Sequence, residues 1–267
     1  MIERVQMDYS GARNRLICLI QITDTHFSAD PEGDLDGVNT RSSFAKVMRH
    51  IQRRESLVHA VLATGDLSHD GSAESYEALR KQFVALRAPV YCIPGNHDSP
   101  AVMNEALIAP NVHIVDNANL GTWHVVFLNT HVQDWEAGRL GEDRLRRFDN
   151  LMSSRSDAPT LVVLHHPPVP IGSPWMDAMG LKDAAEFMAI IDKHPQVRAV
   201  IWGHIHQEFS LRRNGVYFWG APSTCLQFKR GATQYESDTL APGYRRLELV
   251  PDGRIVSDVV RLKSPEH

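Results

Sequence analysis

Short apolar runs rich in Val, Ile and Leu alternate in this chain with polar or amphipathic stretches of helical length. The apolar runs are 16–22, 60–65, 90–93, 125–129, 161–164 and 199–202. Segments 41–55 and 72–87, which lie between them, repeat apolar residues at helical spacing. This alternation is typical of α/β proteins, in which helices connect buried strands. We therefore expect an α/β core.

The C-terminal part has a different pattern. After about residue 207, strand-like segments follow one another with turns between them. Asp252-Gly253 lies between two runs of alternating hydrophobicity, which predicts a β-hairpin. A chain of 267 residues can bury one large core, and neither a repeat nor a linker-like composition marks a boundary. We therefore expect a single domain over 1–267, with a β-rich part at about 207–262.

Five of the apolar runs end in side chains that can bind metal ions. The residues that follow them are Asp24 and His26, then Asp66, then Asn96, His97 and Asp98, then His165 and His166, and finally His204 and His206. In open α/β sheets, ligands bind at the carboxyl ends of the strands. We therefore expect these ends, which span 24–206, to meet at one crevice.

The chemistry of this set indicates metal-assisted hydrolysis. Carboxylates, an amide oxygen and imidazoles without a thiolate suit Mn, Fe, Zn or Co. The candidates are Asp24, His26, Asp66, Asn96, His97, His165, His204 and His206. They are enough for two ions, and Asp66 could give one oxygen to each. Two ions about 3.5–4 Å apart hold the attacking and leaving oxygens of a phosphate ester in line, and a histidine that binds no metal is the usual proton donor.

The ordered motifs resemble those of the calcineurin-like metallophosphoesterase family. They are D-T-H at 24–26, G-D at 65–66, G-N-H-D at 95–98, H-H-P-P at 165–168 and G-H-I-H at 203–206. The resemblance covers about 16–210, and the complete ordered set is far more specific than any single motif. It implies an α/β (α+β) fold, namely a four-layer α/β/β/α sandwich of two mixed β-sheets flanked by helices.

Matched residue by residue, the resemblance implies two metal ions. Asp24, His26, Asp66 and His206 would hold the first, and Asp66, Asn96, His165 and His204 the second. His97 is implied to bind no metal and to act beside the scissile phosphate as a general acid or charge stabiliser. Asp66 joins it among the catalytic residues, while Asn96, His97 and His166 are expected at the substrate. Fe and Mn are the expected metals, in divalent or trivalent form, with Zn or Co as alternatives.

A closer resemblance lies in the stretches around these motifs. GDLSHDGSAESY at 65–76, HHPPVPIGSPWMD at 165–177, GHIHQEF at 203–209 and APSTCLQF at 221–228 resemble class III cyclic-nucleotide phosphodiesterases. The likeness extends to about residue 262 and implies hydrolysis of 3′,5′-cyclic AMP to 5′-AMP by in-line attack of a metal-bound hydroxide. One alternative is a broader metallophosphoesterase acting on 2′,3′-cyclic nucleotides, glycerophosphodiesters, other phosphodiesters or phosphomonoesters. The other is a non-catalytic scaffold with the same fold.

Charge, hydrophobicity and cysteine content indicate which partners and which cellular compartment to expect. A net charge of −4 lacks the basic excess of proteins that bind long nucleic acids. No apolar run approaches the roughly 20 residues that span a bilayer, and the N-terminal 15 residues lack the apolar segment of an export signal. The cysteines Cys18, Cys92 and Cys225 form no C-x-x-C pair and indicate reduced, buried thiols. We expect a cytoplasmic enzyme with a small cyclic nucleotide as its partner, either a monomer or a homodimer.

Some residues near the motifs keep two interpretations. Trp175 could stack on a base or close a hydrophobic lid. The hydroxyls in 222–225 could reach the site, or the segment could form an edge-strand turn. Asp98 could orient His97 or hold its turn to the scaffold, whereas His69 is expected to stabilise the turn after the second motif. Gly95 is expected to permit the sharp turn before Asn96.

Overall fold

The computed structural model describes residues 15–262, which contain two six-stranded mixed sheets. The first sheet has the order β16-β15-β1-β4-β5-β6. Its strands are β1 (Ile17–Ile22), β4 (Ala60–Thr64), β5 (Val90–Ile93), β6 (Val112–His113), β15 (Gly243–Leu249) and β16 (Ile255–Arg261). The second sheet has the order β11-β12-β10-β9-β8-β7. Its strands are β7 (Asn117–Leu120), β8 (Trp123–Phe127), β9 (Thr160–Val163), β10 (Val197–Trp202), β11 (Phe209–Arg213) and β12 (Val216–Gly220).

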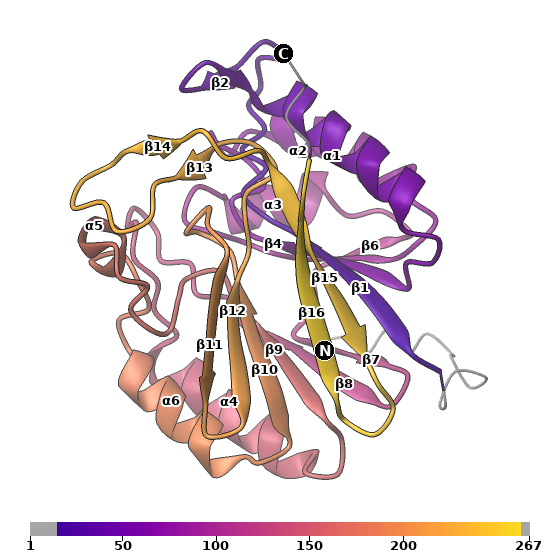
Figure 1. Ribbon diagram of the computed structural model, residues 1–267, viewed down its shortest axis with the longest axis vertical. Coiled ribbons are helices and arrows are strands. Elements are labelled where there is room, and N and C mark those ends of the chain that lie inside the picture. The colour runs from indigo at the N-terminus through magenta and orange to yellow at the C-terminus, as the bar shows by residue number, and fades with distance from the viewer. Residues whose placement is uncertain (1–14, 263–267) are drawn as a thin grey trace.

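Helices cover the outer faces of both sheets. They are α1 (Thr40–Arg54), α2 (Ala73–Val84), α3 (Pro100–Ala106), α4 (Gly141–Ser154) and α6 (Ala184–Lys193), whereas the short helix α5 (Pro174–Asp177) lies in the loop after β9. Two short ribbons complete the described elements, β2 (Asp34–Leu35) with β3 (Val38–Asn39) and β13 (Gln227–Phe228) with β14 (Ser237–Asp238). As Figure 1 shows, α1 and α2 lie on the side of the first sheet, and α4 and α6 on the side of the second.

Three apolar cores separate these four layers. The first lies between helices α1 to α3 and the first sheet and contains Phe44. The second lies between the two sheets and contains Leu19, while the third, with Phe148, lies between the second sheet and helices α4 and α6. Leu19 and Ile20 are neighbours on β1 and point into different cores because side chains alternate along a strand. Burial on both faces explains the continuous apolar runs, and the predicted four-layer sandwich is confirmed.

Local signals set the helix starts. The side chain of Asn39 accepts a hydrogen bond from the backbone N–H of Ser42 at the start of α1, and Ser72 does the same for Ser75 at α2. Both helices therefore form where the periodic pattern predicted them. Among residues 15–262, no helix has the length and apolar character needed to cross a bilayer.

Most predicted strands are found at the expected places. β8 begins two residues earlier than the run 125–129, because Trp123 pairs with Leu120 in the antiparallel β7–β8 hairpin. The predicted C-terminal hairpin forms between β15 and β16, with Leu249 opposite Ile255. The single domain over 1–267 stays a prediction, and residues 1–14 of the segment analysed for an export signal lie outside the described part.

Candidate active site

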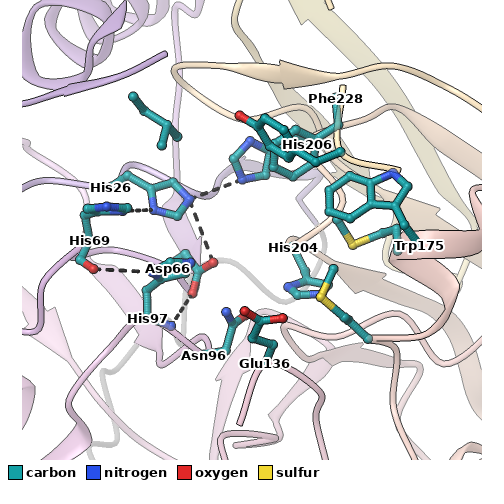
Figure 2. Close-up of a pocket in the computed structure, with 14 residues that line it drawn as sticks. His26, Asp66, His69, Asn96, His97, Glu136, Trp175, His204, His206 and Phe228 are labelled. Carbon is teal, nitrogen blue, oxygen red and sulfur yellow. Dashed lines mark hydrogen bonds and ion pairs between the residues drawn. The ribbon is translucent and has the colours of Figure 1, made fainter. Parts of the chain in front are cut away.

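The carboxyl ends of five strands meet at one end of the sandwich. Strands β1, β4 and β5 belong to the first sheet, and β9 and β10 to the second. The expected crevice therefore lies between two sheets, rather than at the edge of the single open sheet expected from the strand pattern. Residues that follow four of these strands border a cavity of about 400 Å³ (Figure 2), whereas His165 and His166, which follow β9, do not line it. Its walls include the side chains of His26, Asp66, Asn96, His97, His204 and His206.

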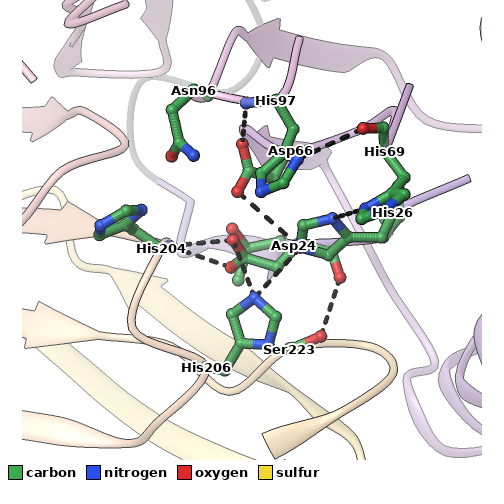
Figure 3. A network of polar contacts seen from close by, with 12 residues as sticks. Asp24, His26, Asp66, His69, Asn96, His97, His204, His206 and Ser223 are labelled. Carbon is green, nitrogen blue, oxygen red and sulfur yellow. Dashed lines mark hydrogen bonds and ion pairs between the residues drawn. The ribbon is translucent and has the colours of Figure 1, made fainter. Parts of the chain in front are cut away.

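Asp24, His26 and His206 form a first ligand group. Their candidate ligand atoms lie within 4.8 Å of one another. Nε2 of His206 is 3.5 Å from Oδ1 of Asp24 and 3.2 Å from Nε2 of His26 (Figure 3). Two imidazole nitrogens that face each other beside a carboxylate suit a shared cation better than a hydrogen bond.

A second group lies around His165. Its Nε2 is 3.2 Å from Oδ1 of Asn96 and 3.4 Å from Oδ1 of Asp66. His204 packs beside this ring, with ring centroids 5.1 Å apart, and its Nε2 is buried without a hydrogen-bond partner in the described structure. A buried imidazole nitrogen without a partner is unfavourable in a metal-free site and is the kind of atom that a metal ion satisfies.

Asp66 lies between the two groups. Its Oδ1 faces His165, and its Oδ2 lies 3.8 Å from Nε2 of His26. One carboxylate therefore offers an oxygen to each group, which is the arrangement that a bridging ligand needs. The residues present fit a pair of metal ions with mixed oxygen and nitrogen ligands.

The backbone is strained at five of the seven predicted metal ligands. Asp24, His26, Asp66, His204 and His206 have φ between 46° and 66°. This left-handed region is uncommon for residues other than glycine, and such strain persists only where the surrounding structure enforces it. The concentration of this strain at the site indicates that the surrounding structure holds these residues in an unfavourable backbone conformation, which directs their side chains toward one another.

Two glycines allow the motifs to approach closely. A Cβ on Gly95 would lie 2.1 Å from Oδ1 of Asp66, and one on Gly203 would lie 2.0 Å from Oγ1 of Thr23. Gly95 is not one of the glycines with a positive φ. Close approach to the carboxylate is therefore the reason for glycine at 95, and not the turn geometry expected from the sequence.

Burial and charge set the ionisation of the site. Burial lowers the pKa of His26 and of His204 well below the usual range, which keeps both rings neutral, as metal ligands must be. Burial would raise the pKa of Asp66, but the charges of His165 and His97 outweigh it and hold the pKa well below its usual range. Burial alone would lower the pKa of His165, yet the charge of Asp66 raises it to about 9.

His97 and Asp98 have different surroundings. The His97 side chain is exposed at the cavity wall, and its Nδ1 lies 3.3 Å from the backbone oxygen of His69. The Asp98 carboxylate is buried and accepts hydrogen bonds from the backbone N–H groups of Leu67, Ser68 and Gly95 and from the hydroxyl of Tyr76. These contacts favour the interpretation that Asp98 holds the turn to the scaffold.

His166 lies behind the ligand groups. Its Nδ1 contacts Oγ1 of Thr130 at 2.7 Å and its Nε2 contacts the backbone oxygen of Glu136 at 3.1 Å. The ring is fully buried and packs 4.7 Å from that of His204. Both ring nitrogens thus have protein partners and His166 does not line the cavity, which supports a role in holding His204 in place rather than contact with a substrate.

The segment 222–225 contacts the backbone of the first motif. The Ser223 hydroxyl donates to the backbone oxygen of Asp24 at 2.8 Å, and the N–H of Thr224 donates to the backbone oxygen of Thr23 at 3.2 Å. These contacts favour the interpretation that hydroxyls of this segment reach the site. The Ser223 hydroxyl, however, contacts the backbone of Asp24, a proposed ligand, and does not line the cavity.

Several cavity residues were not selected from the sequence. They are Leu35, His69, Glu136, Met179, Phe228 and Tyr235. His131 was also missed, although its Nδ1 contacts the backbone oxygen of Gly95 at 2.9 Å. None of these residues belongs to a ligand motif. His69 follows Asp66 closely in the chain and Phe228 ends the stretch 221–228, which are the local signals that could have found them, whereas the others reach the site through tertiary structure.

Comparisons with known proteins agree with this geometry. Residues 19–208 match the calcineurin-like phosphoesterase family. The chain is 37% identical over 246 residues to a 3′,5′-cyclic-nucleotide phosphodiesterase of Nostoc sp., with 92% of each chain covered. It is 36% identical over 245 residues to the 3′,5′-cyclic adenosine monophosphate phosphodiesterase CpdA of Escherichia coli K12, with 91% of this chain and 89% of the relative covered.

Solved structures show the same fold. A dimetal phosphatase from Danio rerio matches with a TM-score of 0.63 at 12% identity, covering 92% of this chain and 98% of that one. GAP50 of Plasmodium matches with a TM-score of 0.64 at 14% identity, covering 94% and 86%. The family match, the relatives that cover nearly the whole chain and the shared two-sheet fold show that this chain belongs to the calcineurin-like phosphoesterase family.

Proposed function

We propose that this protein is a binuclear metal-dependent phosphodiesterase that hydrolyses 3′,5′-cyclic AMP to 5′-AMP. The observation that carries the proposal is the position of Asp66, whose two oxygens each face one of two groups of metal-binding side chains at the same cavity. The substrate is proposed because relatives 36–37% identical over about nine tenths of the chain are named as phosphodiesterases of cyclic nucleotides.

Seven side chains would hold the two ions. We assign Asp24, His26, Asp66 and His206 to the first and Asp66, Asn96, His165 and His204 to the second, with Fe or Mn as the expected metals and Zn or Co as alternatives. When bound, the ions would offset the charge of the phosphate and lower the pKa of a water molecule. Hydrogen bonds from the outer ring nitrogens of His165 and His206 to the backbone oxygens of Thr64 and Leu226, each 2.8 Å long, orient these ligands.

His97 has the properties of a proton donor. It is exposed to the cavity, and its backbone N–H donates to Oδ1 of Asp66 at 3.0 Å, so its ring is held beside the ligand groups. In the proposed reaction, hydroxide derived from water forms a new bond to phosphorus as the P–O3′ bond breaks, and the protonated His97 ring gives a proton to the departing 3′ oxygen. Asn96 contributes its amide oxygen to the second group, and His166 positions His204 from behind.

The setting of the enzyme is also a proposal. Cys18, Cys92 and Cys225 are free and buried, as expected for reduced thiols, which supports a cytoplasmic location. The net charge of −4 supports a small-molecule substrate over a long nucleic acid. Monomer and homodimer both remain compatible with the proposed activity.

A substrate panel tests the proposal. The metal-reconstituted protein should give its highest kcat/KM with 3′,5′-cyclic AMP, compared with 2′,3′-cyclic AMP, a glycerophosphodiester and bis(4-nitrophenyl) phosphate. Turnover of the other esters with negligible turnover of 3′,5′-cyclic AMP would favour the broader metallophosphoesterase. A metal-loaded protein that hydrolyses none of them would favour the scaffold.

A further inference from the structure

The cavity has an apolar end opposite its polar one. Trp175, Phe228 and Tyr235 line this end, and we call these three rings the aromatic wall. Met176, the neighbour of Trp175 in the chain, is another lining residue. Figure 2 shows Trp175 and Phe228 across the cavity from His69 and His97. One space therefore joins metal-binding side chains to a surface of aromatic rings.

The aromatic wall is built firmly. Trp175 meets Phe228 and Tyr235 edge to face, with ring centroids 5.2 Å and 5.6 Å apart. Phe228 stacks on His206 with centroids 4.0 Å apart and ring planes 9° apart. The wall therefore packs directly against a candidate metal ligand, so it is continuous with the site.

Hydrogen bonds tie together the segments that carry these rings. The Tyr235 hydroxyl donates to Oδ2 of Asp36 at 2.6 Å, which links it to the β2–β3 ribbon. The N–H of Gly231 donates to Oγ of Ser173 at 2.9 Å, just before Trp175 in the chain. Three segments distant in sequence thus hold one surface, so the sequence could single out Trp175 but not the three rings together.

Resting on the proposed function, we propose that the aromatic wall binds the nucleobase of the substrate. A cyclic nucleotide has a charged phosphate at one end and a flat ring with an apolar face at the other, and the cavity has the same two halves. Its volume of about 400 Å³ falls within the range of small-molecule sites. Every nucleobase has a flat π-face that can stack on an aromatic side chain. The aromatic wall should therefore favour nucleotides over phosphate esters that have no base.

Two substrates that differ only in the base test this proposal. Trp175→Ala should lower kcat/KM for 3′,5′-cyclic AMP about tenfold, while kcat/KM for a ribose 3′,5′-cyclic phosphate without a base stays unchanged. Trp175→Phe should retain most of the activity because it keeps a ring. Trp135→Ala is the matched control, since Trp135 is exposed and does not line the cavity.

The outcomes separate the two proposals. Equal losses on both substrates would overturn the role of the wall while leaving the enzyme a cyclic AMP phosphodiesterase. No turnover of cyclic AMP by the wild type, with other diesters hydrolysed, would instead overturn the proposed function. Should Trp175→Ala fail to fold, Tyr235→Leu gives the same comparison, because Tyr235 is largely exposed.

A second inference rests on different contacts and concerns His69. Nε2 of His26 faces His206 and Asp66, so its Nδ1 points the other way, where it lies 3.4 Å from Nδ1 of His69. When Nε2 of a histidine binds a metal, Nδ1 carries the proton and donates it to an outer partner. His165 and His206 use backbone oxygens for this purpose, whereas His26 has a side chain.

His69 also contacts His97. Their rings stack with centroids 5.1 Å apart and planes 20° apart, and the His69 backbone oxygen accepts from Nδ1 of His97. The N–H of His69 is fixed in turn by the backbone oxygen of Phe27 at 2.7 Å. We infer that His69 is a positioning residue that fixes the metal-binding tautomer of His26 and the orientation of His97. This inference rests on the proposed ligand role of His26.

Metal affinity tests the role of His69 without any substrate. His69→Ala should weaken binding of Mn²⁺ to the metal-free protein about tenfold, as the loss of an outer partner does elsewhere. His69→Asn should restore most of the affinity, because its amide oxygen can accept at nearly the same place. The Kd is measured by competition with a chelator.

Two results would overturn this second inference. Wild-type affinity in His69→Ala would show that His26 needs no partner there. Equal losses in His69→Ala and His69→Asn would show that hydrogen-bond acceptance is not the property that matters. The side chain is exposed, so both variants are expected to fold, and a thermal melt checks this.

Discussion

The carboxylate of Asp66 reaches both ligand groups because its backbone is held in a left-handed conformation, with φ of 48°. His97 reaches the same cavity from the neighbouring motif but contacts it with an exposed ring. At the scale of single residues, we therefore expect Asp66 to be needed for metal binding and His97 for proton transfer.

Substitution of these two residues tests that separation. Asp66→Asn should lose both metal and activity, because the amide offers one oxygen and no charge. His97→Ala should keep its metal while kcat falls about 10²–10⁴-fold, the usual contribution of a general acid. Elemental analysis of the purified variants measures metal content, and loss of an ion from His97→Ala would contradict the assignment.

Asp98 has a structural task at the same turn. Its carboxylate accepts from three backbone N–H groups, of Leu67, Ser68 and Gly95. Asp98→Ala should lower the free energy of unfolding by about 2–4 kcal/mol, because buried donors lose their acceptor. Urea denaturation measures this, and Asp98→Asn should lose less since it keeps one acceptor oxygen. A variant with a reduced kcat but unchanged stability would favour orientation of His97 instead.

At the scale of elements, strand β8 contains a buried histidine, His124, that is not part of the proposed site. Burial, and then the charge of Arg155, lowers the pKa of His124 to about 4. In the unfolded chain the pKa is near 6.5. Between about pH 6.5 and 4, only the unfolded state takes up this proton, so the folded state is destabilised as the pH falls.

This proton linkage has a measurable slope. The free energy of unfolding should decrease by up to about 1.4 kcal/mol per pH unit through that window on account of His124. His124→Gln should show a shallower decrease, although it is less stable at neutral pH because the replaced ring is fully buried. Identical slopes in urea denaturation of the two proteins would contradict the burial of a neutral ring.

Elements also show what the sequence could and could not predict. The strands and the helices α1 and α2 follow from periodicity, and the ligand residues follow from their places at strand ends. The division of the strands between two sheets does not, because β1 and β10 are both short, mostly apolar and almost entirely buried. The left-handed backbone at the ligands and the contact of His69 with His26 depend on tertiary packing, which leaves no local signal.

At the scale of the whole molecule, Arg245 joins the two sheets. It lies on β15 of the first sheet, is 3% exposed, and donates to the backbone oxygens of Gly220 and Phe209 in the second. It also donates to Oγ of Ser257 on β16. Burial lowers its pKa to about 10, so the guanidinium is still charged at neutral pH.

Removal of this link should weaken the sandwich. Arg245→Ala should lower the free energy of unfolding by about 2–4 kcal/mol, because it leaves a cavity and removes the donor of the hydrogen bonds between the sheets. Arg254→Ala, at the exposed β15–β16 turn, is the matched control and should change little. Equal stability of the two variants would mean that Arg245 does not couple the sheets.

The division of the ligand residues between two sheets has a consequence for biosynthesis. A nascent chain that stops before His165 has the aspartates and His26 but none of the imidazoles that β9 and β10 supply. The first sheet is itself incomplete until β15 pairs with β1. Because such a site forms only as the chain folds, we expect the proposed metal ions to bind after both sheets have formed. Chains that end before β9 would therefore lack the complete proposed site.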